Sequence, residues 1–505
     1  MLIALDTSLN KPLYIQIRDQ IRERILGGAL GIGERLEPSR ELAKRLGIHR
    51  TTVSNAYADL EAEGLIEGTV GRGTFVSTYA ASLRQPVPRR RASTDFYWDS
   101  LFAPDQEDDS LGRLMASALD PNVISLAATH ASSELSPMDL VRRATEAVLR
   151  REGARLLEYG ATDGYPPLKQ YLQARLRRDG IAIESDELLI TNGCQQSLDL
   201  VRRILVGPGD AVACENPTYP GLWHVFDLPG VRLIGIPIGA EGMDLDSLES
   251  VLEQNKLKLI LTNPNFQNPT GRSMPLAARK RLLELAARFQ VPIAEDDIYG
   301  SLRYYGRELP PLKALDTAGL VIHLNSFSKI GFPGFRVGWI AASRRVIDHL
   351  RTAKQRADLH TNLLGQAVLE EFGRRGWLDK LLRKTRKVYE HKLAVLRRAI
   401  EETFPPEARV NFPEGGMAVW VELPAGLDAG ELLGKARDRK VMFAPARFFY
   451  FQNPQHNAFR LCFTTVSDEQ LDRSVRILGE LLKSEIRRGR TGHKPTPVGS
   501  AVALV

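Results

Sequence analysis

The most informative stretch of the sequence is Asn325-Ser326-Phe327-Ser328-Lys329-Ile330-Gly331-Phe332-Pro333-Gly334-Phe335-Arg336. A lysine amine can form a Schiff base with an aldehyde cofactor, and the usual one is pyridoxal 5′-phosphate (PLP). Such a cofactor also needs hydroxyl groups and an arginine to hold its phosphate, and Ser326, Ser328 and Arg336 flank the lysine. The stretch therefore predicts a cofactor-binding lysine, although Lys329 alone could also be an ordinary surface residue.

Length and composition indicate a multi-domain globular protein. At 505 residues the chain is too long for one core and suggests two or three domains. It contains no apolar run long enough to span a membrane, and its start lacks the pattern of a signal peptide. The cysteines, Cys194, Cys214 and Cys462, are widely spaced, fit a reducing compartment and show no metal-ligand spacing. We therefore expect a cytoplasmic protein with neither a membrane nor a metal partner.

Four segments are predicted along the chain. They are a DNA-binding module over residues 10–78, a linker over 79–94, an α/β domain over 95–485 and a disordered tail over 486–505. In the α/β domain helical and strand patterns alternate, which predicts a mainly parallel sheet with a smaller C-terminal subdomain. The strongest strand candidates are residues 188–191, 211–214, 257–262, 291–294 and 320–324, and a long helix is expected over 380–402.

The N-terminal segment has the pattern of a winged helix-turn-helix. The expected elements are a helix within 13–30 that ends at Gly27-Gly28, a helix over 40–46 with Ser39 as its N-cap, a helix over 51–62 after the Gly47 turn, and wing strands over 65–67 and 73–76. The second helix of such a motif enters the DNA major groove. The alternative is a helical protein-interaction domain with incidental arginines.

Net charge adds little to the case for DNA. The chain carries a formal charge of +7, but residues 1–78 contain ten basic and ten acidic residues. The excess lies partly in Arg84 and Arg89-Arg90-Arg91 of the linker, which could contact phosphates or simply be solvated. The case for DNA binding must therefore rest on individual side chains.

Those side chains resemble the winged helix-turn-helix of the GntR family of bacterial transcription factors. The matching segments are Pro38-Ser39-Arg40-Glu41-Leu42-Ala43, Arg50-Thr51-Thr52-Val53, Leu60-Glu61-Ala62-Glu63-Gly64-Leu65-Ile66 and Gly71-Arg72-Gly73-Thr74. The resemblance implies DNA contacts from Arg40, from Arg50, Thr51 and Thr52 with His49 beside them in the major groove, and from Gly71 and Arg72 in the minor groove. Glu37 departs from the family pattern and is expected to point away from DNA or to fix a local helix.

Ser-x-Ser-Lys with an arginine seven residues later resembles the cofactor lysine of fold-type-I aminotransferases. Further parts of that site follow in family order. The resemblance implies a phosphate site at Gly193, Cys194 and Gln195, where a strand meets a helix, together with Ser326, Ser328 and Arg336. It also implies that Tyr219 stacks on the pyridine ring and that Asn268 and Tyr299 bind its phenolic oxygen.

Three further roles follow from the same resemblance. Asp296 would keep the pyridine nitrogen protonated, so that the ring can act as an electron sink; Asp297 is its rival for that role. Tyr159 would reach the phosphate of a neighbouring subunit. Arg460 would clamp the α-carboxylate of an amino acid, because an arginine fork binds a carboxylate through two bonds.

A GntR-type reader joined to an aminotransferase-like domain resembles the MocR subfamily of bacterial regulators. The resemblance implies a homodimer that binds a DNA operator, with PLP at Lys329, alone or joined to an amino-compound effector, modulating that binding. The alternative is an active class I/II aminotransferase of α-amino acids with an attached DNA-binding domain, because no catalytic residue is missing: Lys329, Asp296 and Tyr219 are present. A structural scaffold with vestigial PLP chemistry would instead predict a damaged Lys329 or Asp296, and neither is damaged.

Overall fold

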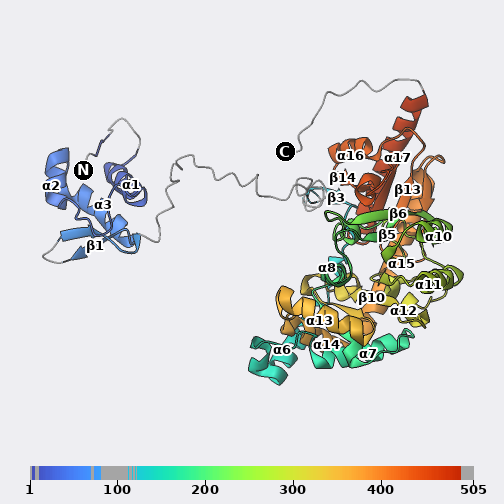
Figure 1. Ribbon diagram of the computed structural model, residues 1–505. Helices are drawn as coiled ribbons and strands as arrows, with labels where there is room; N and C mark the ends of the chain where they lie inside the picture. The colour runs from blue at the N-terminus through green and yellow to red at the C-terminus, as the bar shows by residue number, and fades with distance from the viewer. Residues whose placement is uncertain are drawn as a thin grey trace. The chain divides into compact units, whose positions relative to one another are not determined.

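The chain forms two compact units, residues 1–107 and 108–505, which Figure 1 shows in blue and in cyan to red. This computed structural model describes residues 3–5, 11–69, 73–80, 112, 117, 120 and 122–490. Most of the predicted linker, Gly71, Arg72 and the tail from 491 onward lie outside the described residues. In the described part of the chain, no helix combines the length and the apolar character that a membrane span requires.

The first unit is a helix-turn-helix with a two-stranded wing, as predicted. Its elements are α1 (Leu13–Leu26), α2 (Ser39–Leu46), α3 (Arg50–Ala62), β1 (Ile66–Thr69) and β2 (Gly73–Val76). The two strands pair antiparallel. The predicted N-cap is wrong by one residue: Ser39 is the first residue of α2, and Pro38, with an extended ψ of 137°, takes the cap position without a side-chain bond.

A single apolar cluster holds this unit together. Ile17, Ile21 and Ile25 recur every fourth residue on α1 and are fully buried, as are Val53 and Leu60 of α3. These residues pack the two helices against each other, while α2 lies against α3. The unit therefore has a hydrophobic core of its own.

Glu37 stabilises the entry to the helix pair, as expected. Its carboxylate accepts a bond from Nη2 of Arg45, at the end of α2, at 2.8 Å. The Tyr57 hydroxyl of α3 donates to the Glu37 carbonyl oxygen at 2.7 Å. Glu37, the residue that departs from the family pattern, thus connects α2 to α3 through these two hydrogen bonds.

The second unit is built on an eight-stranded sheet. In spatial order the strands are β4 (Leu188–Thr191), β11 (Gly338–Ala341), β10 (Val321–Ser326), β9 (Ile293–Asp296), β8 (Leu257–Thr262), β5 (Ala211–Asn216), β6 (Arg232–Gly239) and β7 (Gly242–Met243). The central pairs from β10 to β6 are parallel, and the pairs at both margins are antiparallel. β9 begins two residues later than predicted, after Pro292, which has no N–H to donate to a ladder.

Helices cover both faces of this sheet. One face carries α8 (Cys194–Leu205) and α13 (Arg344–Asp358), whose apolar residues join those of the strands in one cluster. The other face carries α10 (Leu245–Gln254), α11 (Leu276–Phe289) and α12 (Leu312–Leu315). A third cluster joins β4 and β11 to α6 (Met138–Glu152), α7 (Pro166–Arg178), α14 (Leu363–Arg374) and α15 (Trp377–Thr403).

A smaller subdomain follows α15, which is the predicted long helix. It contains a four-stranded sheet of β12 (Arg409–Asn411), β13 (Ala418–Glu422), β16 (Ala458–Cys462) and β15 (Ala444–Pro445), with α16 (Ala429–Asp438) and α17 (Asp468–Arg490). β14 (Val441–Met442) pairs in parallel with β3 (Ile124–Ser125), from the start of the unit. α17 continues to Arg490, five residues past the predicted end of the domain.

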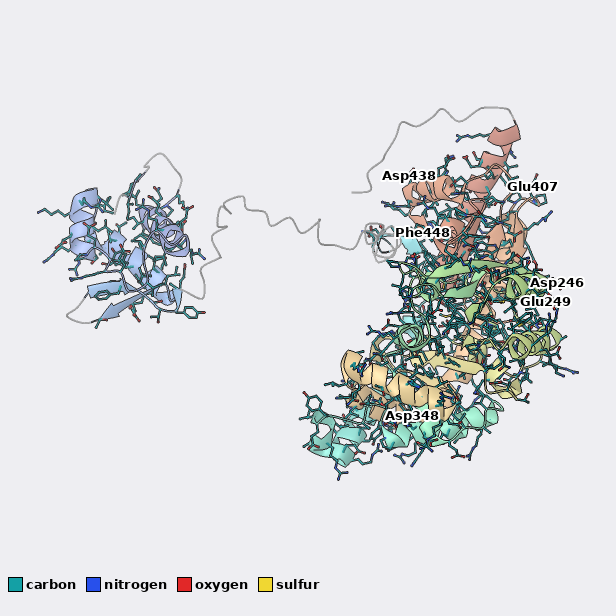
Figure 2. All side chains as sticks on the ribbon, viewed as in Figure 1. Asp246, Glu249, Asp348, Glu407, Asp438 and Phe448 are labelled. Carbon is teal, nitrogen blue, oxygen red and sulfur yellow. The ribbon has the colours of Figure 1, made fainter. Side chains whose placement is uncertain are left out.

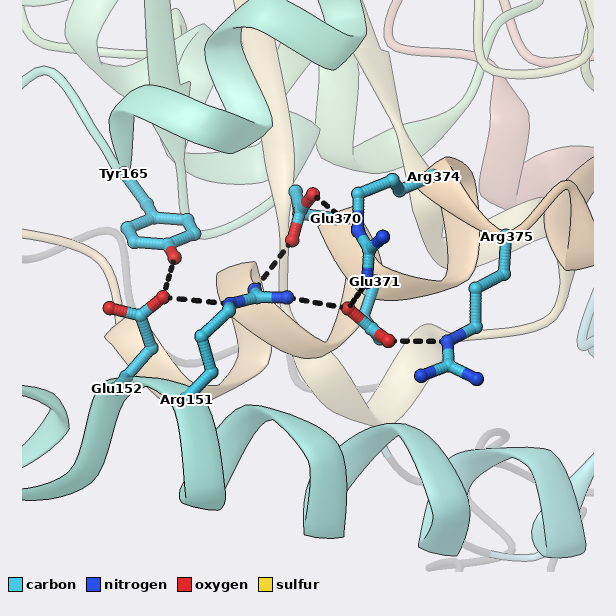
Figure 3. A network of polar contacts seen from close by, with 7 residues as sticks. All are labelled: Arg151, Glu152, Tyr165, Glu370, Glu371, Arg374 and Arg375. Atoms are coloured by element: carbon cyan, nitrogen blue, oxygen red, sulfur yellow. Dashed lines mark hydrogen bonds and ion pairs between the residues drawn. The ribbon is translucent and has the colours of Figure 1, made fainter.

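Charged side chains also tie neighbouring helices. On the surface, Asp246 and Glu249 of α10 accept bonds from Arg281 of α11 at 2.6 and 3.0 Å (Figure 2). Exposed pairs of this kind contribute little to stability. The buried network around Glu371, which joins α6 to α14 and reaches Tyr165 just before α7, is a different case (Figure 3).

Candidate functional site

Lys329 follows β10 directly, in the short 3-10 helix η6 (Phe327–Ile330). Its Nζ donates to the carbonyl oxygen of Thr129 at 2.9 Å and lies 5.8 Å from the centre of the Tyr299 ring. Burial lowers the pKa of the Lys329 amine. A lysine that loses its proton more readily is a better nucleophile toward an aldehyde.

Asp296 ends β9 at the same edge of the sheet. Its Oδ1 is buried and has no hydrogen-bonding partner among the described residues, and burial raises the pKa of the carboxyl to about 7. A protonated ring nitrogen would supply the missing donor. Asp297, the rival, already accepts a bond from Nδ2 of Asn265 at 2.6 Å. The unpartnered oxygen therefore fits Asp296 to a pyridine N–H.

A phosphate cradle forms where β4 meets α8. Gly193 has a φ of 89°, and a Cβ at this position would lie 2.7 Å from Nη2 of Arg336, so that only glycine allows the guanidinium to lie against the loop. Arg336 donates to Ser328 Oγ at 3.3 Å, and Ser328 N donates to Ser326 Oγ at 3.1 Å. Cys194 opens α8, whose first N–H groups point outward. A guanidinium, hydroxyls and helix N–H groups thus converge, as a phosphate requires.

Gln195 and Tyr219 meet at Gly221, beside this cradle. Gln195 Nε2 donates to the Gly221 carbonyl oxygen at 3.0 Å, and a Cβ on Gly221 would lie 2.4 Å from the Tyr219 ring. Burial raises the pKa of Tyr219, with Lys329 close enough to oppose the shift. The Tyr219 ring therefore lies against Gly221 at the edge of the cradle, and its stacking on a cofactor ring stays a prediction.

Arg460 lies in β16, on the other side of the site. Its Nη1 donates to Asn268 Oδ1 at 2.6 Å, its Nη2 donates to the Ala127 carbonyl oxygen, and its Nε is buried without a partner among the described residues. Its guanidinium carbon lies 4.8 Å from the centre of the Phe449 ring. Burial raises the pKa of nearby Tyr299 to about 12, so that its hydroxyl remains a donor at neutral pH.

Tyr159 is the one predicted cofactor residue that does not join this group within the described part of the chain. It is 85% exposed and meets the His360 ring edge-on, with 5.9 Å between ring centres. An exposed aromatic ring of this size is available to another molecule.

Sequence reasoning missed several residues of the site. Ala127 and Thr129 contact Arg460 and Lys329 through backbone carbonyls, which leave no motif in a sequence. Asn263 is a further residue of the site that the sequence analysis gave no role. Its Nδ2 donates to the Asp296 carbonyl oxygen, and its Oδ1 accepts a bond from Asn268 N at 3.0 Å, which ties the Asn268 loop to β9.

In the first unit, Arg40 and Arg50 are exposed at the first turns of α2 and α3, and neither forms an ion pair within the described residues. Thr51 and Thr52 follow Arg50. His49 is the N-cap of α3: its Nδ1 accepts from Thr51 N at 3.4 Å and lies 2.8 Å from Thr51 Oγ1. His49 thus has a structural role beside the one that was predicted.

Two known protein families match this chain. Residues 13–76 match the bacterial regulatory proteins of the gntR family, and residues 122–478 match the aminotransferases of class I and II. The chain belongs to the MocR subfamily. In MocR proteins a GntR-type DNA-binding module precedes an aminotransferase domain, so the predicted architecture and fold class are confirmed.

The similar proteins include aminotransferases, which match only the second unit, and transcriptional regulators, which match both units. The aromatic-amino-acid aminotransferase 1 of Thermococcus litoralis is 39% identical over 73% of this chain and 89% of its own length. The uncharacterized HTH-type transcriptional regulator YdfD of Bacillus subtilis is 30% identical over 94% of this chain and 96% of its own length. Among solved structures, the α-aminoadipate aminotransferase LysN of Thermus thermophilus, complexed with N-(5′-phosphopyridoxyl)-L-leucine, is 35% identical. That match covers 77% of this MocR chain and 99% of LysN, with a TM-score of 0.71. The cofactor of the aminotransferase domain is therefore PLP, as predicted.

Proposed function

We propose that this protein is a transcriptional regulator whose operator binding responds to PLP at Lys329, alone or with an amino compound as effector. The observation that carries the proposal is the presence of a DNA-reading module and an undamaged PLP site on one chain. The regulator relative spans both units, whereas the aminotransferase relative spans only the second.

Within the proposed site each residue binds or orients one part of the ligand. PLP supplies an electron sink when bound. Lys329 holds its aldehyde carbon, and Asp296 holds the ring nitrogen through the unpartnered Oδ1. Gly193, Cys194, Gln195, Ser326, Ser328 and Arg336 hold the phosphate. Tyr219 stacks on the ring, and Asn268 and Tyr299 bind its phenolic oxygen.

Arg460 is the proposed receptor for the effector carboxylate. Its Nε and Nη2 point to the same side of the guanidinium: the buried Nε has no partner among the described residues, and Nη2 can exchange the Ala127 carbonyl oxygen for a carboxylate oxygen. Two parallel bonds from one guanidinium would select a planar carboxylate over a neutral group. The effector class is therefore an amine that also carries a carboxylate.

The proposed assembly is a homodimer. Leu157, the last residue of the 3-10 helix η3 (Gly153–Leu157), and Tyr159, two residues further on, are 90% and 85% exposed, and an exposed apolar pair favours a protein contact. Tyr159 would then reach the phosphate of the partner subunit. A regulator of this kind acts where the chromosome lies, which places it in the cytoplasm.

The proposal is tested by titrating amino acids into the PLP-loaded protein while operator affinity and visible absorbance are recorded. A spectral change that persists, together with an altered operator affinity, is the expected result. Lys329→Ala should remove both responses while the protein stays folded. Lys392→Ala, which removes a buried amine bound to the Val466 carbonyl oxygen, is the matched control and should keep both. An unchanged response in Lys329→Ala would refute the proposal.

The second candidate function is transamination of an α-amino acid. It is favoured by the 39% identity to an aromatic-amino-acid aminotransferase, whereas the intact set of groups around Lys329 would serve transamination and the sensing of an amino compound equally. Release of a keto acid with conversion of the cofactor to its amine form would establish it. Binding without release would leave sensing as the function.

A further inference from the structure

The segment that forms the phosphate cradle is also bonded to the end of α13. Asp358 is the last residue of that helix, and its Oδ2 accepts bonds from Asn192 Nδ2 at 2.5 Å and from Gln196 Nε2 at 2.7 Å. These two side chains, the loop amides, lie on either side of Gly193: Asn192 directly before it and Gln196 in the first turn of α8. One carboxylate oxygen therefore holds both ends of the segment.

The loop amides are also bonded within the cradle. Gln196 Oε1 accepts from Asn192 N at 2.8 Å, which leaves the Nε2 of Gln196 for Asp358. The Asn192 carbonyl oxygen accepts from Nη2 of Arg336, the guanidinium of the cradle, at 3.2 Å. A displacement of Asn192 would therefore disturb both Arg336 and the backbone at Gly193.

Asp358 is itself held by a buried lysine one turn earlier in α13. Lys354 Nζ donates to Oδ1 and to Oδ2 of Asp358, each at 2.7 Å, and the Lys354 side chain has no exposed surface. A carboxylate only accepts hydrogen bonds, so its two oxygens can fix the lysine and both loop amides at once. A buried ion pair adds little net stability compared with well-packed apolar side chains. The pair is therefore better explained by orientation of the loop than by stability of the fold.

Helix α13 gives this contact a rigid support. Ile347 and Leu350 of α13 pack in the same apolar cluster as Leu198 and Val201 of α8. The two helices are therefore held against each other, and Asp358 has a fixed place beside the cradle. Groups that are supported by packed elements hold a binding geometry more closely than groups on loops do.

We propose that Asp358 is a positioning residue for the cofactor phosphate. It holds the two loop amides so that Arg336 and the first N–H groups of α8 converge on one point. The proposal rests on the phosphate site proposed above and adds to it a residue that acts through its neighbours. Donors that are already ordered lose little entropy when an anion binds. Asp358 should therefore increase the affinity for the phosphate of the cofactor and leave the contacts to its ring and aldehyde unchanged.

The test compares PLP with pyridoxal, which has the same ring and aldehyde but no phosphate. Both are titrated into cofactor-free, full-length protein, and visible absorbance gives the two dissociation constants. Asp358→Ala should weaken PLP binding about tenfold and pyridoxal binding by less than about twofold. Loss of a negative charge near a phosphate would by itself strengthen PLP binding, so that weaker binding isolates the effect of positioning.

Asp199→Ala is the matched control. Asp199 lies on α8 and is half-buried like Asp358, but its carboxylate binds Arg202 and Arg203 of its own helix, each at 2.7 Å. This variant should keep both dissociation constants of the wild type. Asp358→Ala leaves Lys354 without a counter-charge, so the double variant Lys354→Met/Asp358→Ala, which removes the buried ammonium as well, takes its place if the single variant does not fold.

Arg336→Ala distinguishes a failure of this inference from a failure of the phosphate site. That variant should lose PLP affinity and keep pyridoxal affinity. If it does so while Asp358→Ala and the double variant bind PLP as the wild type does, the phosphate site stands and the positioning role is overturned. Equal weakening of PLP and pyridoxal in Asp358→Ala would also overturn it, because the residue would then only support the fold. Wild-type PLP binding in Arg336→Ala would refute the phosphate site itself, and this inference with it.

Discussion

At the carboxyl end of β9, the Asp296 oxygen that lacks a partner among the described residues links stability to cofactor binding. The pKa of this carboxyl, about 7 in the folded chain, exceeds the ordinary value of 3.8 because the site is buried. Between those two values the unfolded chain releases the proton and the folded chain retains it. Cofactor-free protein therefore loses stability as pH rises from about 4 to about 7, and a positively charged ring nitrogen would restore it.

Asp296→Asn should accordingly raise the melting temperature of cofactor-free protein at pH 7.5, by an amount that reflects a few kcal/mol. The difference from the wild type should vanish below pH 4. The same variant should bind PLP about ten- to hundredfold more weakly, because it loses a charge-assisted bond. Thermal unfolding across pH and PLP titration measure the two effects. A variant less stable than the wild type at pH 7.5 would contradict the role given to burial.

Residues of the candidate site could be recognised in the sequence where their side chains form a motif, but not where a backbone carbonyl makes the contact; the roles given to them stay predictions. The sequence singles out Lys329, Asp296 and Arg336, and the structure brings all three to one edge of the sheet. Thr129 is invisible in the sequence, because it serves through a carbonyl oxygen 200 residues away from its partner. His49 was predicted to lie beside the DNA-contacting residues. In the structure its ring also caps the first turn of α3, a role that the sequence analysis did not give it.

Among the elements, the α6–α14 contact depends on a buried acid. Glu371 is fully buried and binds Nη1 of Arg151 and Nη2 of Arg374, each at 2.6 Å, and also Arg375 (Figure 3). Burial alone would raise the pKa of this carboxyl, but the three guanidinium groups outweigh it and lower the pKa to about 2. The stabilisation is therefore present above about pH 4.5 and is lost as pH falls toward 2.

Glu371→Gln should destabilise the protein at pH 7 by about 2–4 kcal/mol, because it leaves guanidinium groups without their counter-charge. The difference should shrink as pH approaches 2. Glu370→Gln is the matched control: Glu370 binds Arg151 at 2.8 Å and Arg374 only at 3.5 Å, so its loss should matter less. Denaturant unfolding at several pH values measures both. Equal effects from the two variants would show that burial, rather than the arginine contacts, sets the stability.

The recognition helix supplies the next prediction. Arg50 is the exposed first residue of α3 and has no structural partner among the described residues that its loss would disturb. Arg50→Ala should weaken operator binding by about 1–3 kcal/mol while leaving the melting temperature and the PLP absorbance unchanged. Arg24→Ala, in the last turn of α1, is the control and should bind DNA normally. Gel-shift titration decides between them, and equal affinities would remove Arg50 from the DNA surface.

The hydrophobic periodicity predicted which segments are helices and which are strands, but it did not always predict the residues at which they begin and end. The apolar spacing of α1 and the long pattern of α15 predicted both helices to within a few residues. β9 was placed two residues early because Val291 and Pro292 look like strand residues, whereas Pro292 cannot donate to the ladder. The end of α17 at Arg490 was missed because composition suggested a tail there, while Leu471, Val475, Leu478 and Leu482 anchor the helix in the core.

For the whole molecule, the order of the domains could be predicted from the sequence. The effect of ligand binding in the second unit on DNA binding by the first could not. The family motifs give a reader followed by a PLP domain, and both units have separate cores. In the proposed homodimer, communication between the units would be a property of the assembly, because each of the two DNA-binding modules would read one operator half-site. The free energy that would couple DNA binding to ligand binding therefore cannot be derived from the structure of either unit alone.

The effect of the second unit on DNA binding can therefore be measured by comparing the operator affinity of the first unit alone with that of the full chain. A fragment of residues 1–80 keeps the whole apolar cluster of the first unit and should fold and bind operator DNA without any response to PLP. The full chain should bind more tightly, by a factor of about 10² or more from linked half-sites, and its affinity should change when PLP and an amino acid are added. Fluorescence anisotropy with one and two half-sites separates the two contributions. If the fragment bound the two-site operator with the same affinity as the full chain, the second unit would contribute neither dimerisation nor sensing. That result would contradict the proposed regulator and favour an enzyme that carries a DNA-binding module.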